Sequence, residues 1–246
     1  MSAVLELSDL HAGYAGVPAV RGVSLAVGAG EVVALLGPNG AGKTTTLLTV
    51  AGVLPVIDGD VGLLGQSVRG RRVHEIARRG LALVPEDRGL FMQLSVRENL
   101  RLGRRCKGSR SPSDVLAMFP ALEGLLARRA GLLSGGEQQM LALAKALVSE
   151  PRLLMVDELS LGLAPIVVER LLPSVRRLAH EEGMAVLLVE QHVHMALAVA
   201  DRAYVLSRGQ LALQGTPAEV RERRELLESS YLGGHRHQPG NVEDGA

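Results

Sequence analysis

The sequence is poor in cysteine and in aromatic residues: it has one cysteine (Cys106), no tryptophan, two phenylalanines and three tyrosines. A single cysteine excludes an intramolecular disulfide and cannot by itself form a thiolate metal site, and it fits a reducing compartment. Because aromatic side chains are so scarce, Tyr14 is informative, since it stands among small residues in an exposed-looking turn. It can stack on an adenine ring or pack on its own sheet, and the residue alone does not choose between these roles.

Long apolar runs and an excess of charge of one sign are also missing. No apolar run approaches the roughly 20 residues that span a bilayer. The first residues, 1–9, carry acids where a signal peptide needs basic and then apolar residues. The chain has 27 Lys plus Arg and 26 Asp plus Glu, a net charge of +1, which gives no electrostatic reason to propose nucleic acid as a partner. We therefore expect a cytoplasmic protein that reaches a membrane only through a partner.

A glycine-punctuated turn lies between an apolar run, residues 32–36, and a helix-compatible segment. It has the pattern G-x-x-x-x-G-K-[ST] in the strand, loop and helix context of a phosphate-binding loop. The glycines let backbone N–H groups turn inward, Lys43 can reach the β- and γ-phosphates, and the Thr44 hydroxyl can bind Mg²⁺. A chance glycine turn is the disfavoured alternative. The candidate nucleotide-binding residues here are Gly37, Pro38, Asn39, Gly40, Ala41, Gly42, Lys43, Thr44 and Thr45.

Two further apolar runs, 153–156 and 185–189, end in polar residues that fit the same site. The first is followed by Asp157 and Glu158, the second by Glu190, Gln191 and His192. In open α/β sheets, ligands bind beyond the carboxyl ends of the strands. Asp157 is therefore predicted to hold Mg²⁺, and Glu158 to polarise the water that attacks the γ-phosphate. A strand end leaving the core is the alternative, which the upstream phosphate loop makes less favoured.

The order of these signals predicts an α/β fold with a mostly parallel sheet core, an N-terminal antiparallel β portion and a helical insertion at about 87–131. Residues 1–232 are predicted to form one domain, and 233–246 a disordered tail. A turn is expected at Asp58-Gly59 and a kink at Pro173. Further expected strands are 4–7, 17–20, 23–27, 61–64, 81–84 and a hairpin over 204–213; expected helices are 43–52, 72–79, 96–102, 114–128, 134–149, 165–181 and 193–200.

Three segments in this order resemble the ATP-binding-cassette (ABC) ATPases: Gly37–Thr45, Leu133–Gln139 and Leu153–Glu158. The similarity covers about residues 3–232, and its most specific part is the signature segment Ser134, Gly135, Gly136, Glu137 and Gln138. The resemblance implies a P-loop NTPase ABC cassette that binds ATP and Mg²⁺. It also implies a head-to-tail dimer, in which each ATP lies between the phosphate loop of one cassette and the signature segment of the other. Tyr14 takes the position of the adenine-stacking aromatic.

Segments 84–91, 96–100, 160–165 and 189–192 are similar to the LivF-like branch of this family. Its members are ATPases of high-affinity importers of branched-chain amino acids, and the branch also includes importers of other amides and small amino acids. The resemblance implies a second ATPase (LivG-like, or a second copy), two permease subunits and, indirectly, a solute-binding protein. The loop from Glu86 to Phe91 is then expected to dock a permease coupling helix.

Three positions depart from the general cassette pattern. Glu86 stands where most members have a glutamine that senses Mg²⁺, the attacking water and the permease, and Gln191 stands where most have the switch histidine. His192, the next residue, is a candidate base, although a loop histidine near phosphate is the favoured interpretation. Leu159 replaces the proline usual after the catalytic glutamate. An importer ATPase is favoured over a soluble cassette without a permease and over a regulatory module that hydrolyses ATP weakly, which Glu86 and Gln191 leave open.

Overall fold

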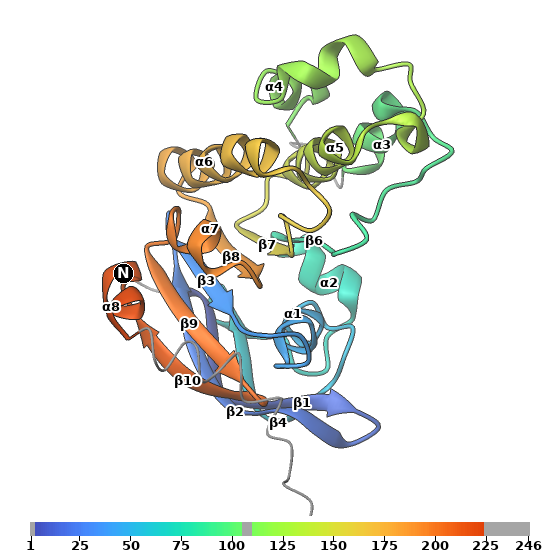
Figure 1. The fold of residues 1–246 in the computed structure, drawn as a ribbon. Helices are drawn as coiled ribbons and strands as arrows, with labels where there is room; N and C mark the ends of the chain where they lie inside the picture. The colour runs from blue at the N-terminus through green and yellow to red at the C-terminus, as the bar shows by residue number, and fades with distance from the viewer. Residues whose placement is uncertain (1–2, 105–109, 224–246) are drawn as a thin grey trace, which may run out of the picture.

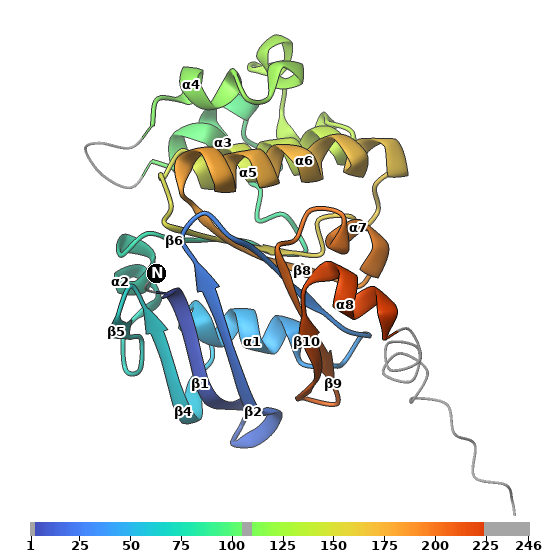
Figure 2. The same cartoon turned by 90° about the vertical axis from the view of Figure 1, so that its left-hand side faces the viewer.

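The computed structural model describes residues 3–104 and 110–223, arranged as two β-sheets with helices on either side of the larger one (Figure 1). Cys106 and the predicted tail 233–246 lie outside the described residues. In both views α3–α6 lie on one side of the central sheet, and the antiparallel sheet with α1 lies on the other (Figures 1 and 2). This confirms the predicted α/β class.

The central sheet has the strand order β10-β9-β3-β8-β7-β6. All neighbours are parallel except β10, which forms an antiparallel hairpin with β9 at one edge. Every residue of β3, β7 and β8 is buried, as expected for strands covered on both faces. The strands are β3 (Val32–Leu36), β6 (Leu81–Val84), β7 (Leu153–Asp157), β8 (Ala185–Glu190), β9 (Arg202–Ser207) and β10 (Gln210–Gly215).

The smaller sheet is antiparallel, in the order β2-β1-β4-β5. The strands are β1 (Ala3–Tyr14), β2 (Val17–Gly28), β4 (Val56–Leu63) and β5 (Gln66–Ser67). The expectation of several short strands before residue 28 is wrong, because register shifts absorb the irregular residues within two long strands. The turn expected at Asp58-Gly59 is also wrong. Gly59 lies inside β4 with φ +77°, where a Cβ would come within 2.2 Å of the Asp9 carbonyl oxygen.

Alternate residues of β3 enter two different hydrophobic cores. Val32, Ala34 and Leu36 pack toward α3, α5 and α6, whereas Val33 and Leu35 pack toward α1 and the antiparallel sheet. This division follows from the two-residue period of a strand. The carboxyl end of β3 is therefore fixed from both sides, and the loop that follows it starts from a rigid point.

The helices are α1 (Lys43–Val50), α2 (Val73–Arg78), α3 (Val96–Leu102), α4 (Pro112–Leu116), α5 (Gly135–Leu147), α6 (Pro165–Glu182), α7 (Val193–Leu197) and α8 (Pro217–Glu222), with 3₁₀ turns η1 (Pro120–Leu125) and η2 (Ala130–Leu132). The capping box of Ser95 and Glu98 opens α3 as predicted. The helix expected over 114–128 is wrong: α4 ends before Pro120, which lacks an N–H group for a continuing helix. The helix α6 runs through Pro173.

The helices of the described residues include none that is both long and apolar enough to cross a membrane. The bounds of the helical insertion stay a prediction.

Candidate functional site

The phosphate-loop segment connects the buried strand β3 to α1 through a turn that requires glycine. At Gly37 a Cβ would lie 2.4 Å from the carbonyl oxygen of Leu206, so no larger residue fits without movement of the backbone. Gly42 caps α1 with φ +104°, a left-handed conformation that side chains disfavour. The N-terminus of α1 consequently opens directly behind the turn, where unpaired N–H groups and the helix dipole favour an anion.

Lys43 is buried, and its ammonium group lies under the turn. Its Nζ donates hydrogen bonds to the carbonyl oxygens of Gly37 (2.9 Å) and Pro38 (3.2 Å). The same Nζ lies 3.4 Å from Oε1 of Glu158. A buried cation needs such partners, because losing hydration without them is costly. Two predicted site residues from distant parts of the chain are thus in contact.

Asp157 and Thr44 form a second contact of this kind. The Thr44 hydroxyl donates to Oδ2 of Asp157 at 3.0 Å. Oδ1 of Asp157 is buried and has no hydrogen-bond partner among the described residues. Burial raises the pKa of Asp157 to about 6 against the hydrogen bond from Thr44, which lowers it, and the nearby carboxylates of Glu158 and Glu86 raise it further. The charge of Lys43 acts in the opposite direction and lowers this pKa, but burial outweighs it.

A cleft of about 500 Å³ lies over these contacts, at the carboxyl end of β3, β7 and β8. Tyr14 stands at its margin, 54% exposed, and belongs to the end of β1. The turn beneath the cleft contains Gly37, Pro38 and Ala41. Asp157 is buried behind Thr44. His192 is exposed at the start of α7. The lining residues are Tyr14, Ala19, Asn39, Gly40, Gly42, Lys43, Thr44, Thr45, Glu86, Glu158, Leu161 and Gln191.

The chain matches known proteins over most of its length. The model of the family described as ABC transporter matches residues 20–160. The high-affinity branched-chain amino acid transport ATP-binding protein BraG of Pseudomonas aeruginosa is 40% identical, over 94% of this chain and 100% of its own. This chain belongs to the ABC transporter family.

Two other matches help to define the cassette. The lipopolysaccharide export system ATP-binding protein LptB of Escherichia coli is 34% identical, over 94% of this chain and 98% of its own. A solved structure described as the ATP binding subunit of an ABC transporter superposes with a TM-score of 0.80 at 28% identity, over 94% of this chain and 98% of its own. The predicted family and fold are confirmed, and the P-loop NTPase cassette is the fold of this chain.

The signature segment of this cassette lies on α5, apart from the cleft. Ser134 is exposed and caps the helix, accepting a hydrogen bond from the backbone N–H of Glu137 while the Glu137 carboxylate accepts one from the N–H of Ser134. Gly135 and Gly136 are half-buried, and a Cβ on Gly136 would lie 2.9 Å from Val167 at the start of α6. Within one chain, the signature segment therefore lies away from the phosphate loop, and these two sets of predicted nucleotide-binding residues are not brought together.

Two residues of the cassette make side-chain contacts that were not predicted. Glu190, the last residue of β8, is fully buried and accepts hydrogen bonds from Ser160. Arg88 reaches from the loop after β6 to the side chains of Gln138 and Gln139 on α5. Glu190 was predicted to end a strand at the site, but its contact with Ser160 was not predicted. Arg88 and Gln138 are 50 positions apart in the sequence, so no local sequence pattern predicts their contact.

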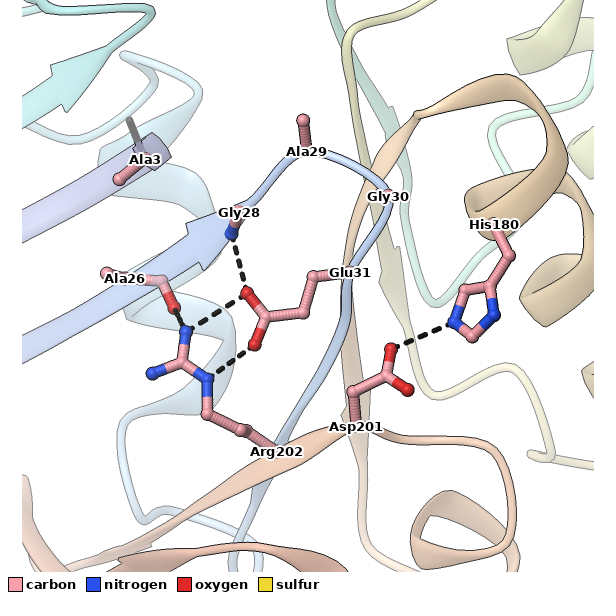
Figure 3. A pocket seen from close by; sticks show the side chains of 9 residues that line it. All are labelled: Ala3, Ala26, Gly28, Ala29, Gly30, Glu31, His180, Asp201 and Arg202. Atoms are coloured by element: carbon pink, nitrogen blue, oxygen red, sulfur yellow. Dashed lines mark hydrogen bonds and ion pairs between the residues drawn. The ribbon is translucent and has the colours of Figure 1, made fainter. Parts of the chain in front are cut away.

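A second cleft of the cassette lies at the opposite, amino-terminal edge of the central sheet (Figure 3). There the Arg202 guanidinium pairs with the carboxylate of Glu31, which also accepts a hydrogen bond from the N–H of Gly28. His180 lies 3.1 Å from Asp201, whose carboxylate also accepts a hydrogen bond from the N–H of Val32. These groups satisfy one another and join β2, β3, β9 and α6. We interpret them as structural contacts.

Proposed function

We propose that this cassette is the ATP-hydrolysing subunit of an importer of branched-chain or other small hydrophobic amino acids. The observation that supports hydrolysis best is the convergence of Lys43, Thr44, Asp157 and Glu158 beyond the ends of β3 and β7. The higher identity to BraG than to LptB supports amino-acid transport over lipopolysaccharide export.

In this proposal the phosphates of ATP enter the turn of residues 37–42, where the N–H groups and the end of α1 face them. Tyr14 offers its exposed ring to the adenine. Lys43 is held by two carbonyl oxygens and Glu158 when no phosphate is present. The γ-phosphate competes for the ammonium group, and this frees Glu158 to accept a hydrogen bond from the attacking water.

The donor set fits Mg²⁺ bound together with a nucleotide. Asp157 has one oxygen without a described partner, and Thr44 supplies a hydroxyl beside it. Among the described residues no group of three His, Cys, Asp or Glu side chains could hold a metal alone. Mg²⁺ is usually bound by one or two carboxylates, waters and substrate phosphates, as these residues permit. Bound Mg²⁺ would supply charge neutralisation at the phosphates. Glu86 lines the same cleft and offers a further carboxylate.

Gln191 lines the cleft, so its amide can orient the water or the γ-phosphate. His192 is exposed and lies outside the lining, which does not favour its role as a catalytic base.

The separation of the signature segment from the cleft supports a head-to-tail dimer. In that dimer Ser134, Gly135, Gly136 and Glu137 of one cassette would face the nucleotide of the other, with a second, LivG-like ATPase or a copy of this chain as partner. A serine hydroxyl and a helix N-terminus favour the γ-phosphate and lose this contact after hydrolysis. ATP would thus close the dimer, and its hydrolysis would open it.

An exposed apolar patch supports docking to a permease. Phe91 (55% exposed) and Leu132 (63%) belong to it together with Met92, whose carbonyl oxygen accepts a hydrogen bond from the N–H of Gly131. Exposed apolar side chains that cluster mark interaction surfaces. We propose that this patch receives the permease subunits, which would hold the cassette at the inner face of the cell membrane, with a solute-binding protein acting through them.

The test is transport by the assembled complex. We expect cells that carry this chain with its permease and binding-protein subunits to take up leucine, and Glu158→Gln to reduce ATP hydrolysis at least about 100-fold while ATP still binds. Lys43→Ala should instead lose ATP affinity. Hydrolysis by Glu158→Gln at the wild-type rate would overturn the catalytic assignment, and rapid hydrolysis without leucine uptake would overturn the solute.

A regulatory module that hydrolyses ATP weakly is the alternative. The relatives reported above are transport or export proteins by name, which does not favour it. The wild-type rate in the assembled complex distinguishes the two proposals, since a regulatory module would hydrolyse as slowly as Glu158→Gln.

A further inference from the structure

We propose that Glu190 is a positioning residue for Glu158: its carboxylate holds the segment after Glu158 in the conformation that aims the Glu158 side chain into the cleft. The inference rests on the proposed role of Glu158 in hydrolysis. It assigns a task to a buried carboxylate that the site described above does not use.

The backbone at Glu158 needs external support. Its φ is +48°, in the left-handed region that residues other than glycine rarely adopt. Such a conformation persists where the surroundings impose it, and it is found preferentially at functional sites. The next residue is Leu159, which packs fully buried in the core and places no proline ring on the backbone.

The end of β8 supplies this support on both sides of Leu159. The N–H of Glu158 donates to the carbonyl oxygen of Val189 at 2.9 Å. The N–H of Ser160 donates to Oε1 of Glu190 at 2.9 Å, and the Ser160 hydroxyl donates to Oε2 at 2.7 Å. Two consecutive residues of β8 thus hold the residues before and after Leu159.

A role in packing alone does not explain a carboxylate at this position. The five residues of β8 before Glu190 are apolar and buried, and an apolar side chain would continue that pattern. Glu190 has no exposed surface, and Ser160 is 6% exposed. Burying a carboxylate is costly unless hydrogen bonds compensate. Here both oxygens accept bonds from one residue, so the carboxylate specifies where Ser160, and with it Glu158, must lie.

The experiment compares turnover with nucleotide affinity in the full chain. We expect Glu190→Ala to lower kcat for ATP hydrolysis about tenfold or more, and to change the Kd for a fluorescent ATP analogue by less than about threefold, because Lys43 and the turn at 37–42 remain intact. Glu190→Gln should retain most of the turnover, since its amide can accept from the N–H of Ser160 and donate to the hydroxyl. Ser160→Ala, which removes one of the two hydrogen bonds, should have an intermediate kcat.

Glu31→Ala is the matched control. Glu31 also accepts a hydrogen bond from a backbone N–H, at the opposite edge of the same sheet, so its removal should affect folding without a selective loss of kcat. Turnover of Glu190→Ala within twofold of wild type would overturn the proposal, as would equal losses of kcat in Glu190→Ala and Glu31→Ala. If Glu190→Ala does not fold, Ser160→Ala decides, and an unchanged kcat there also overturns it. Glu158→Gln is measured in the same assay. If Glu158→Gln hydrolyses ATP as wild type does, the proposed catalytic role of Glu158 is wrong. If Glu158→Gln is inactive but Glu190→Ala is not impaired, only the role of Glu190 is wrong.

Discussion

Burial and the charges of neighbouring side chains both act on the carboxyl group of Asp157. Its folded-state pKa, raised to about 6 from the ordinary 3.8 mainly by burial, means that the nucleotide-free protein holds a proton there more tightly than the unfolded chain does. Stability from this group is therefore fully present below about pH 4 and is lost as pH rises through 6. In the proposed function, a bound cation would offset this cost by favouring the charged carboxylate.

Replacing this carboxylate by a neutral isostere should stabilise the nucleotide-free protein at high pH. In Asp157→Asn the side-chain oxygen can still accept from Thr44, but no charge forms. Without nucleotide or divalent cations we expect its free energy of unfolding at pH 8 to exceed that of wild type by roughly 1–3 kcal/mol, and the difference to vanish near pH 4.

Urea unfolding between pH 4 and 8 measures this difference. Asp114→Asn, which removes a carboxylate at an exposed position on α4, is the control for the loss of a negative charge away from the cleft. A wild-type protein more stable than Asp157→Asn at pH 8 would contradict the assignment of the raised pKa to Asp157.

At the scale of elements, side chains of α5 and of the loop after β6 hold these two segments together. Nη1 of Arg88 donates to Gln138 (2.5 Å) and its Nε to the buried Gln139 (3.1 Å). In return, Nζ of Lys145 donates to the carbonyl oxygen of Gly89 (2.7 Å) and lies 4.8 Å from the centre of the Phe91 ring. The loop that carries Glu86 and Phe91 is therefore tied by side-chain contacts to the helix that begins at the signature segment.

Arg88→Ala should weaken this connection. Because Gln139 would lose a charged hydrogen-bond donor in a buried position, we expect a loss of about 1–3 kcal/mol in the free energy of unfolding. Amide exchange should become faster in residues 86–91 and 135–139. Exchange measured by mass spectrometry, with Arg97→Ala on the exposed face of α3 as control, checks this. Equal exchange in both variants would show that the contact does not join the two elements.

At the scale of the whole molecule, the two edges of the central sheet have different tasks. The carboxyl edge carries the proposed nucleotide cleft, and the amino edge carries the ion pairs of Glu31 with Arg202 and Asp201 with His180 (Figure 3). The signature segment on α5 belongs to neither cleft. A monomer therefore lacks part of the proposed site, and hydrolysis should depend on association.

Ser134→Arg should separate nucleotide binding from association. Ser134 lies outside the cleft of its own chain, so the Kd for an ATP analogue at low protein concentration should stay within about twofold of wild type. In the Glu158→Gln background, ATP should dimerise the cassette, and Ser134→Arg should prevent this through bulk and charge at the interface. Analytical ultracentrifugation with and without ATP measures it. ATP-dependent dimers of the Ser134→Arg variant would contradict the head-to-tail arrangement.

What the sequence determined by itself is local chemistry. The turn at 37–42, the buried strands β3, β7 and β8 and the cap of α3 follow from patterns that short segments contain, because strand period, glycine conformation and capping act over a few residues. The long strands β1 and β2, the break before Pro120 and the glycine inside β4 were mispredicted where distant contacts overrode the local pattern.

Only the tertiary structure decided which side chains meet. Lys43 contacts Glu158, Thr44 contacts Asp157, and Glu190 holds Ser160 across 30 residues, because parallel strands bring their carboxyl ends to one edge whatever their separation in the chain. Burial of Asp157 and its raised pKa likewise depend on packing from several elements at once. Such contacts cannot be predicted from the periodicity of the sequence, because a local pattern does not identify the partner residue at the end of another strand.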